Sequence, residues 1–293
     1  MDEFSKLHPI VNFIYFIFII GFTMFCMHPV FLGISLISSL IYVIYLKGMY
    51  GIKNSLLVSL SIIIMVVLVN VIINNNGETI IFYIGNKPVF LEAIYYSVAS
   101  FVMFFTVFIC FFCYNEVMTS DKFIYLFGRR FPSLALIISM IFRLIPNMKI
   151  QADNIKNAQK AMGRELDKGS IKKKIQGGMQ LISILITWAL ESSIETVDSM
   201  KSRGYDLSGR SSFKTYKFDT RDRICLSSIL ILIGIILVGI FKGESYISYF
   251  PSIVIEDRSF YSYFIYTAYF IFGNFPMIIN IISNLLWKRY NKK

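Results

Sequence analysis

The chain carries six long apolar segments, each bounded by charged or turn-forming residues. A membrane-spanning helix requires about 20 apolar residues, because it crosses about 30 Å of hydrocarbon at 1.5 Å per residue. The segments of suitable length are Ile10–Met27, Pro29–Leu46, Ser55–Ile73, Val89–Tyr114, Ile224–Phe241 and Phe260–Trp287. The pattern predicts about six transmembrane helices, of which the first two form a tight hairpin.

The lysine and arginine residues divide unequally between the two sides of these predicted spans. With the N-terminus inside, Lys47 and Lys53 lie in a cytoplasmic loop, whereas the external loop before the fourth span holds one cation, Lys87. Residues 119–221 and the tail Lys288–Lys293 also lie inside. Because cytoplasmic loops are enriched in lysine and arginine, we expect a multi-pass protein of the cell (plasma) membrane with both termini cytoplasmic.

The first apolar segment does not have the features of a cleavable signal peptide. The chain opens with Met1-Asp2-Glu3, shows no small-residue cleavage site after Met27, and runs directly into the second segment. We therefore expect Ile10–Met27 to remain in the protein as a membrane helix.

The residues between the fourth and fifth spans are too amphipathic for a linker. Asp121–Arg130 predicts a short interfacial helix, and Leu181–Ser202 predicts a helix that begins apolar and becomes polar. Between them, Pro132–Met148 is apolar but interrupted by Arg143 and Pro146, and Lys149–Lys174 is a basic helical pattern broken near Gly163 and Gly169. We expect a further, flexible break at Gln176–Gly178.

This pattern predicts an all-α polytopic membrane protein in three regions. Residues 1–118 form the N-terminal transmembrane helices, and residues 222–293 form a C-terminal transmembrane hairpin. Residues 119–221 form a cytoplasmic or interfacial region of amphipathic helices.

The composition agrees with a membrane protein and argues against a soluble one. Of the 293 residues, 56% are hydrophobic and only 16% are charged, and the mean hydropathy is +0.62; soluble domains carry about 25% charged residues. The formal net charge of +11 would suggest nucleic-acid binding in a soluble protein. Here the cations lie where they orient a membrane protein, so we expect a lipid bilayer and no nucleic acid as partner.

Few residues of this chain suit catalysis or metal binding. Cys26, Cys110, Cys113 and Cys225 all lie in apolar segments and suit small buried side chains better than a zinc, redox or disulfide site. A phosphate-binding loop is absent from the sequence, and the only histidines are His8 and His28. Asp219-Thr-Arg-Asp222 is the closest approach to a paired-aspartate motif, and we interpret it as a juxtamembrane charge cluster.

Two segments, Asn157–Gly169 and Asp198–Asp206, each contain a helical pattern that ends in a cation and a glycine. A glycine just beyond a helix can adopt the left-handed conformation that closes it. A cation in the last turn suits the negative end of the helix dipole, by about 0.3–1 kcal/mol. A terminal arginine such as Arg203 is also presented outward, where it can make bidentate contacts with a partner carboxylate.

These residues resemble the transmembrane T component of energy-coupling factor (ECF) transporters, the EcfT/CbiQ family. That family carries two short Ala-Arg-Gly-like motifs on cytoplasmic coupling helices. Ser202–Tyr205, with Asp198–Met200 before it and Gly209–Ser211 after it, is similar to the second motif. Phe142–Pro146 resembles the family's Arg-x-x-Pro element, and Leu7–Pro9 resembles its N-terminal His-Pro.

The resemblance implies an energy-coupling scaffold in an ABC-type importer of vitamins or metal ions. Its implied partners are two ABC ATPase subunits and a membrane substrate-binding S subunit. The chain itself would be non-catalytic and carry no metal or cofactor, since the ATPases would bind ATP and Mg and hydrolyse the ATP. Arg203 would be the principal docking residue, flanked by Ser202 and Gly204. The transported substrate would be set by the S subunit.

The first motif departs from the family pattern. Its flanking residues place Met162 where the family has arginine, keep Gly163 in position, and put Arg164 one residue late. One residue along a helix rotates the side chain by about 100°. The resemblance therefore implies a second ATPase-docking position at Met162, Gly163 and Arg164. Either Arg164 reaches the partner through an unwound helix end at Gly163, or this contact lacks its usual charge.

Arg143 lies in an apolar segment, where an unpaired charge would cost several kcal/mol. Glu191 and Glu195, spaced by one helical turn on the apolar-to-polar helix, are the nearest plausible acids. We therefore predict a structural ion pair between Arg143 and one of them. Exchanging the charges of Arg143 and Glu191 together should restore function relative to either single change.

Two other functions are compatible with the sequence. A polytopic intramembrane enzyme could use Glu191, Glu195 and Asp198, which lie along one helix face at i, i+4 and i+7; activity of the purified single chain would identify it. A membrane anchor without energy coupling would co-purify with no nucleotide-binding subunit.

Overall fold

The structure, a computed structural model, describes residues 2–48, 77–84, 87–128, 131–163, 171–205, 216–244, 246–255 and 260–290. The chain divides into two compact units. Unit 1 combines Met1–Phe123 with Tyr216–Lys293, and unit 2 is Ile124–Thr215. The N-terminal and C-terminal transmembrane regions therefore belong to one unit, although the chain between them forms another.

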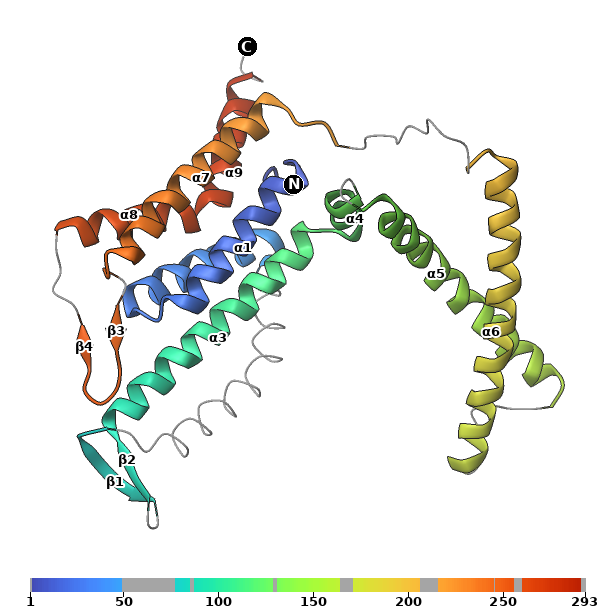
Figure 1. The fold of residues 1–293 in the computed structure, drawn as a ribbon, viewed down its shortest axis with the longest axis horizontal. Helices are drawn as coiled ribbons and strands as arrows, with labels where there is room; N and C mark the ends of the chain where they lie inside the picture. Colours follow the sequence, from blue (N-terminus) through green and yellow to red (C-terminus); the bar gives the residue numbers. More distant parts are fainter. Residues whose placement is uncertain are drawn as a thin grey trace. The chain divides into compact units, whose positions relative to one another are not determined.

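Unit 1 is a bundle of apolar helices (Figure 1). Its helices are α1 (Pro9–Phe25), the helix Pro29–Gly48, α3 (Leu91–Val117), α7 (Thr220–Phe241), α8 (Phe260–Gly273) and α9 (Phe275–Tyr290). α1 packs against both α3 and α7, and α7 packs against α8. The helix α4 (Ser120–Gly128) begins in unit 1 and continues into unit 2.

Within the described residues, three helices are long and apolar enough to cross a membrane: Pro29–Gly48, α3 and α7. α8 and α9 together would make a fourth, and α1 is a shorter apolar helix. The predicted span Ser55–Ile73 lies outside the described residues. The fold is that of an all-α polytopic membrane protein, as predicted.

The last predicted span, Phe260–Trp287, is not one helix. α8 and α9 meet at a bend of 60°. At the break, the Asn274 side-chain amide donates to Ser38 Oγ at 3.0 Å, and the Tyr15 hydroxyl donates to the Gly273 carbonyl at 2.8 Å. Because side chains of other helices satisfy these polar groups, the backbone can leave helical geometry inside the bundle. Gly273, Asn274 and Pro276 were the local signal for this break.

Two His-Pro pairs begin the first two helices. His8 Nδ1 accepts a hydrogen bond from the Ile10 N–H at 3.3 Å, and His28 Nδ1 accepts one from the Val30 N–H at 3.3 Å. Each following proline, at the first helical position, has no N–H that would need a partner. The histidine rings therefore act as helix N-caps.

The core of unit 1 is rich in aromatic side chains. Phe4 is fully buried and packs edge-on against Tyr15, with ring centroids 5.3 Å apart, and against Tyr42, at 6.2 Å. Tyr269 is also fully buried, and its hydroxyl hydrogen-bonds Ser35 Oγ at 2.5 Å. These contacts tie the N-terminal helices to α8.

Two short hairpins interrupt the helical pattern. β1 (Ile80–Ile84) pairs antiparallel with β2 (Lys87–Phe90), and β3 (Ile247–Ser248) pairs with β4 (Val254–Ile255). Residues 80–84, which belong to the predicted external loop before the fourth span, thus form a strand.

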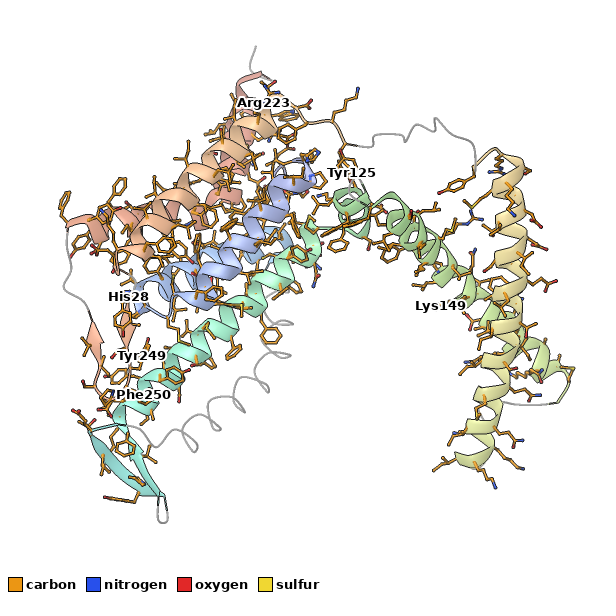
Figure 2. All side chains as sticks on the ribbon, viewed as in Figure 1. His28, Tyr125, Lys149, Arg223, Tyr249 and Phe250 are labelled. Atoms are coloured by element: carbon orange, nitrogen blue, oxygen red, sulfur yellow. The ribbon has the colours of Figure 1, made fainter. Side chains whose placement is uncertain are left out.

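Aromatic side chains link Tyr249 and Phe250, which directly follow β3 (Figure 2), to α3. The ring of Tyr96 on α3 contacts Tyr249 at 5.6 Å and Phe250 at 5.5 Å. The Tyr249 hydroxyl donates to the Met27 carbonyl at 2.7 Å. This end of unit 1 is therefore closed by aromatic packing.

Unit 2 contains two long helices that pack against each other, α5 (Pro132–Ala161) and α6 (Ile171–Ser202). α5 runs through Pro146, which removes a single N–H donor without ending the helix. The predicted break at Gln176–Gly178 is wrong, because α6 is continuous there. Glycine lowers helix propensity by only about 1 kcal/mol, which a long helix can absorb.

Candidate functional site

The end of α6 carries the second motif, and its backbone closes as a Schellman turn. Gly204 has a φ of +75°. Its N–H donates to the Lys201 carbonyl at 2.9 Å, and the Tyr205 N–H donates to the Met200 carbonyl at 3.1 Å. These two bonds, with a left-handed glycine between them, define this motif. The predicted glycine-terminated helix end is confirmed.

The end of α5 carries the first motif and closes in a similar way. Gly163 has a φ of +78°, and its N–H donates to the Lys160 carbonyl at 3.0 Å. The Met162 N–H donates to the Ala158 carbonyl at 3.2 Å. The helix break predicted at Gly163 is therefore confirmed, and Met162 occupies the same place relative to its glycine as Arg203 does.

The two motif side chains are available to a partner. Arg203 is exposed and, within the described residues, forms no ion pair. Ser202 Oγ donates back to the Ser199 carbonyl at 2.8 Å. Met162 is 62% exposed, and Arg164 lies outside the described residues. One helix end presents a cation and the other an apolar side chain.

The predicted ion pair of Arg143 is not formed in this structure. Arg143 lies on α5, Glu191 and Glu195 lie on α6, and all three side chains are exposed. None of the ion pairs between described residues joins Arg143 to either glutamate. Arg143 is exposed in unit 2. An exposed charge gains little from an ion pair, so no partner is required.

The acidic residues considered for an enzyme lie on an open helix face. Glu191, Glu195 and Asp198 are exposed on α6. In the part of the chain that the structure describes, no three His, Cys, Asp or Glu side chains gather as a possible metal site. None of these acids lines the pocket found among the described residues.

α6 also carries an exposed apolar stripe, which we define by its members. They are Ile171, Ile175, Met179, Ile182, Ile186, Leu190, Ile194 and Val197, between 47% and 78% exposed. Their spacing of three or four residues places them along one helix face. On α5, the exposed residues Leu134, Ile137, Ile141 and Ile145 follow the same spacing. Apolar surface of this extent marks an interaction with lipid or with another protein.

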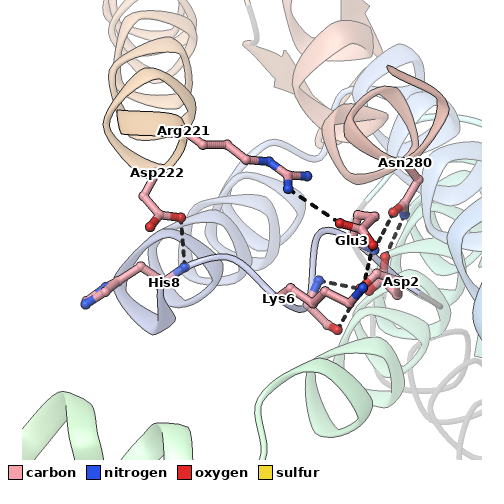
Figure 3. A network of polar contacts seen from close by, with 8 residues as sticks. Asp2, Glu3, Lys6, His8, Arg221, Asp222 and Asn280 are labelled. Carbon is pink, nitrogen blue, oxygen red and sulfur yellow. Dashed lines mark hydrogen bonds and ion pairs between the residues drawn. The ribbon is translucent and has the colours of Figure 1, made fainter. Parts of the chain in front are cut away.

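The sequence did not reveal one polar cluster, which lies at the start of α1 and α7. The backbone N–H of His8 donates to Asp222 Oδ1 at 3.0 Å (Figure 3). Glu3 forms ion pairs with Lys6 at 2.5 Å and with Arg221 at 3.4 Å. The available signals were the His-Pro pair and the aspartates at positions 219 and 222, three residues apart as in a capping box. Their meeting joins distant parts of the chain, which spacing cannot predict.

The described helices define a polytopic membrane protein in which a second unit contributes two long helices with similar glycine-closed ends. The chain belongs to the CbiQ family, described as "Cobalt transport protein", whose sequence profile matches residues 4–215. The match includes α1, both helices of unit 2 and both motifs.

Among curated proteins, the chain is similar to energy-coupling factor transporter transmembrane proteins (EcfT). It is 32% identical to the one from Staphylococcus aureus over 111 residues, which are 38% of this chain and 41% of that protein. It is 29% identical to the one from Lactobacillus helveticus over 106 residues, 36% of this chain and 38% of that protein. The matched segments thus span about two-fifths of these relatives.

Proposed function

We propose that this chain is the transmembrane scaffold of an ECF-type importer, which transmits ATP-driven motion from two ATPase subunits to a substrate-binding S subunit. The observation that carries the proposal is the pair of glycine-closed helix ends at Gly163 and Gly204. Two helix ends with the same kind of backbone closure suit two ATPase subunits. On this view, ATP and Mg are bound by the ATPases, and this chain has no catalytic group of its own.

The exposed Arg203 supports the docking role. A guanidinium at a rigid helix end can form a bidentate contact with a carboxylate, and its position is held by the two Schellman hydrogen bonds. Met162 provides the contact at the other end through an apolar side chain. The two docking sites therefore differ in chemistry, and we expect the two ATPase grooves to differ accordingly.

The apolar stripe on α6 supports a membrane partner. An S subunit that carries a vitamin or metal ion is itself a membrane protein and would offer an apolar helix surface to this stripe. The distribution of lysine and arginine supports unit 2 and both termini on the cytoplasmic side of the cell membrane.

The test reverses the charge at the docking position. In Arg203→Glu, co-purification of the ATPase subunits and substrate uptake should both fall at least about tenfold, since a charge-assisted bidentate contact becomes a repulsion. Lys201→Glu is the matched control, because Lys201 lies in the same last turn of α6 and is also exposed. Equal losses in both variants, or no loss in Arg203→Glu, would contradict the docking role.

Met162→Arg tests the second docking position. If Met162 faces an apolar ATPase groove, the arginine should weaken ATPase association several-fold. If the groove carries a carboxylate, association should strengthen. Either change supports Met162 as a contact, and unchanged association would place the contact elsewhere.

A further inference from the structure

The residues ahead of α1 contact elements from both halves of the chain. We name Asp2–His8 the N-terminal clasp. The Asp2 carboxylate accepts hydrogen bonds from the Tyr42 hydroxyl at 2.8 Å and the Asn280 side-chain amide at 2.6 Å. The Glu3 N–H donates to the same Asn280, at its Oδ1, at 2.7 Å (Figure 3). The clasp is therefore fixed to the helix Pro29–Gly48 and to α9.

The clasp also holds the place where the chain leaves unit 1. Lys122, in the first turn of α4, is only 8% exposed. Its ammonium donates to the carbonyl of Val117, the last residue of α3, at 2.8 Å, and to the carbonyl of Ser5 in the clasp. Burial lowers the pKa of Lys122, whereas the negative charge of Asp2 raises it. One buried cation thus joins α3, α4 and the clasp.

The same segment holds the place where the chain returns. The backbone N–H of His8 donates to Asp222 Oδ1 at 3.0 Å, and the backbone N–H of Asp219 donates to Asp222 Oδ2 at 3.0 Å. The His8 ring packs edge-on against Phe218 at 5.0 Å and Tyr216 at 6.5 Å. The Asp222 carboxylate therefore joins the beginning of α7 to the clasp.

These contacts lie beside the two connections between the units. Unit 1 ends at Phe123 and resumes at Tyr216, so Lys122 and Tyr216 are each next to a connection. A pull on an unsupported helix end opens its first turn, since terminal turns have the lowest local stability. Here the first turns of α4 and α7 are bound to one segment, which is itself bound to two further helices.

We propose that the N-terminal clasp, through Lys122 and Asp222, is a positioning element that transmits movement of unit 2 to the membrane helices. The inference rests on the proposed function, which supplies the ATP-driven movement of unit 2. The linkage of the two connections through one segment can be measured without it. Between described residues, the hydrogen bonds of Lys122 and Asp222 go to Val117, Ser5, His8 and Asp219, none of which is a proposed docking residue.

The linkage is tested by amide hydrogen exchange of the full-length purified chain. In Lys122→Met, exchange should rise at least about threefold at residues 119–123 and also at residues 216–223. In Asp222→Asn, which keeps the side-chain volume, the same two segments should respond. Lys47→Met is the matched control, because Lys47 forms an exposed ion pair with Glu116 outside the clasp; both segments should keep their exchange rates.

The double variant Lys122→Met with Asp222→Asn should increase exchange by less than the product of the single effects, because both changes release the same segment. Exchange that rises only at each variant's own connection, or effects that multiply, would overturn the linkage.

The transmission is tested in proteoliposomes that hold the whole complex. In Lys122→Met and Asp222→Asn, substrate taken up per ATP hydrolysed should fall several-fold while ATPase subunits still co-purify. Lys122→Arg, which keeps the cation, should recover most of the loss. Unchanged uptake per ATP would overturn the transmission. If the unaltered chain bound no ATPase, the proposed function would fail, and the exchange experiment would still decide the linkage.

Discussion

Individual residues decide how the helices of unit 2 end. The positive φ of Gly204 is a conformation that residues with a Cβ adopt only with strain, about 1–2 kcal/mol. Glycine adopts this conformation without strain, and the resulting turn sets the position of the neighbouring Arg203. The glycines at both helix ends were therefore sufficient to predict the local backbone, because glycine adopts a positive φ with little strain.

Gly204→Ala should loosen the last turn of α6. Exchange of the Tyr205 amide, which bonds the Met200 carbonyl, should accelerate about fivefold or more, given the strain of a Cβ at this φ. Gly178→Ala is the control, since a Cβ there has open space around it and the helix interior prefers alanine. Slower exchange at Tyr205 in Gly204→Ala would contradict this assignment.

His8 should make stability depend on pH. Burial lowers the pKa of His8, and the nearby Asp222 raises it by a smaller amount. Between the lowered folded pKa and the ordinary value of about 6.5, the folded chain therefore binds fewer protons than the unfolded chain. Stability should fall as pH drops from 6.5 through the folded pKa.

Thermal unfolding in detergent at pH 7.5 and 5.5 measures this dependence. From pH 7.5 to pH 5.5, the melting temperature of His8→Gln, which has no titrating ring, should decrease by less than that of the unaltered chain. Glu3, whose pKa is lowered chiefly by its hydrogen bond to Lys6, should lose its contribution only at more acidic pH. Equal losses in both proteins would contradict the role of His8.

At the scale of elements, close backbone approaches set how helices pack. A Cβ on Gly239 of α7 would lie 2.8 Å from Ile265 Cγ1 on α8, and Ile265 is fully buried. The neighbouring Gly234 has no atom within 4 Å of such a Cβ. The two glycines look alike in the sequence, and only the packing of α8 distinguishes them.

Gly239→Ala should destabilise unit 1 by about 1–3 kcal/mol, because a closely packed core does not make room for an added methyl group. Gly234→Ala should be neutral or stabilising. The melting temperatures of the two purified variants test this difference. Identical values would show that α7 and α8 do not pack as closely as described.

At the scale of the whole molecule, the buried apolar core lies in unit 1, which also exposes many apolar side chains, whereas the described apolar side chains of unit 2 are half-buried or exposed. The α6 stripe is exposed in the described structure of the single chain. Soluble surfaces rarely carry so much contiguous apolar area. A partner or lipid is therefore needed to cover the apolar stripe of unit 2.

Under the proposed function, an S subunit should protect the apolar stripe of α6. In a chain without native cysteines, maleimide labelling of Ile182→Cys should slow at least about fivefold when the complex with the S subunit forms, since the interface excludes solvent. Gln180→Cys, roughly opposite on the helix, should label at an unchanged rate. Protection of both positions without the S subunit would indicate lipid in place of protein.

Apolar runs and cation placement were enough to predict a polytopic all-α protein, because the bilayer demands long apolar helices and the cytoplasm retains basic loops. The glycine-closed helix ends and the family motifs were also predictable, since they depend on neighbouring residues. The bend at Asn274, the exposure of Arg143 and the clasp around Lys122 and Asp222 were not. Each depends on contacts, or on missing contacts, between residues far apart in the chain, and a sequence pattern contains no information on which distant groups meet.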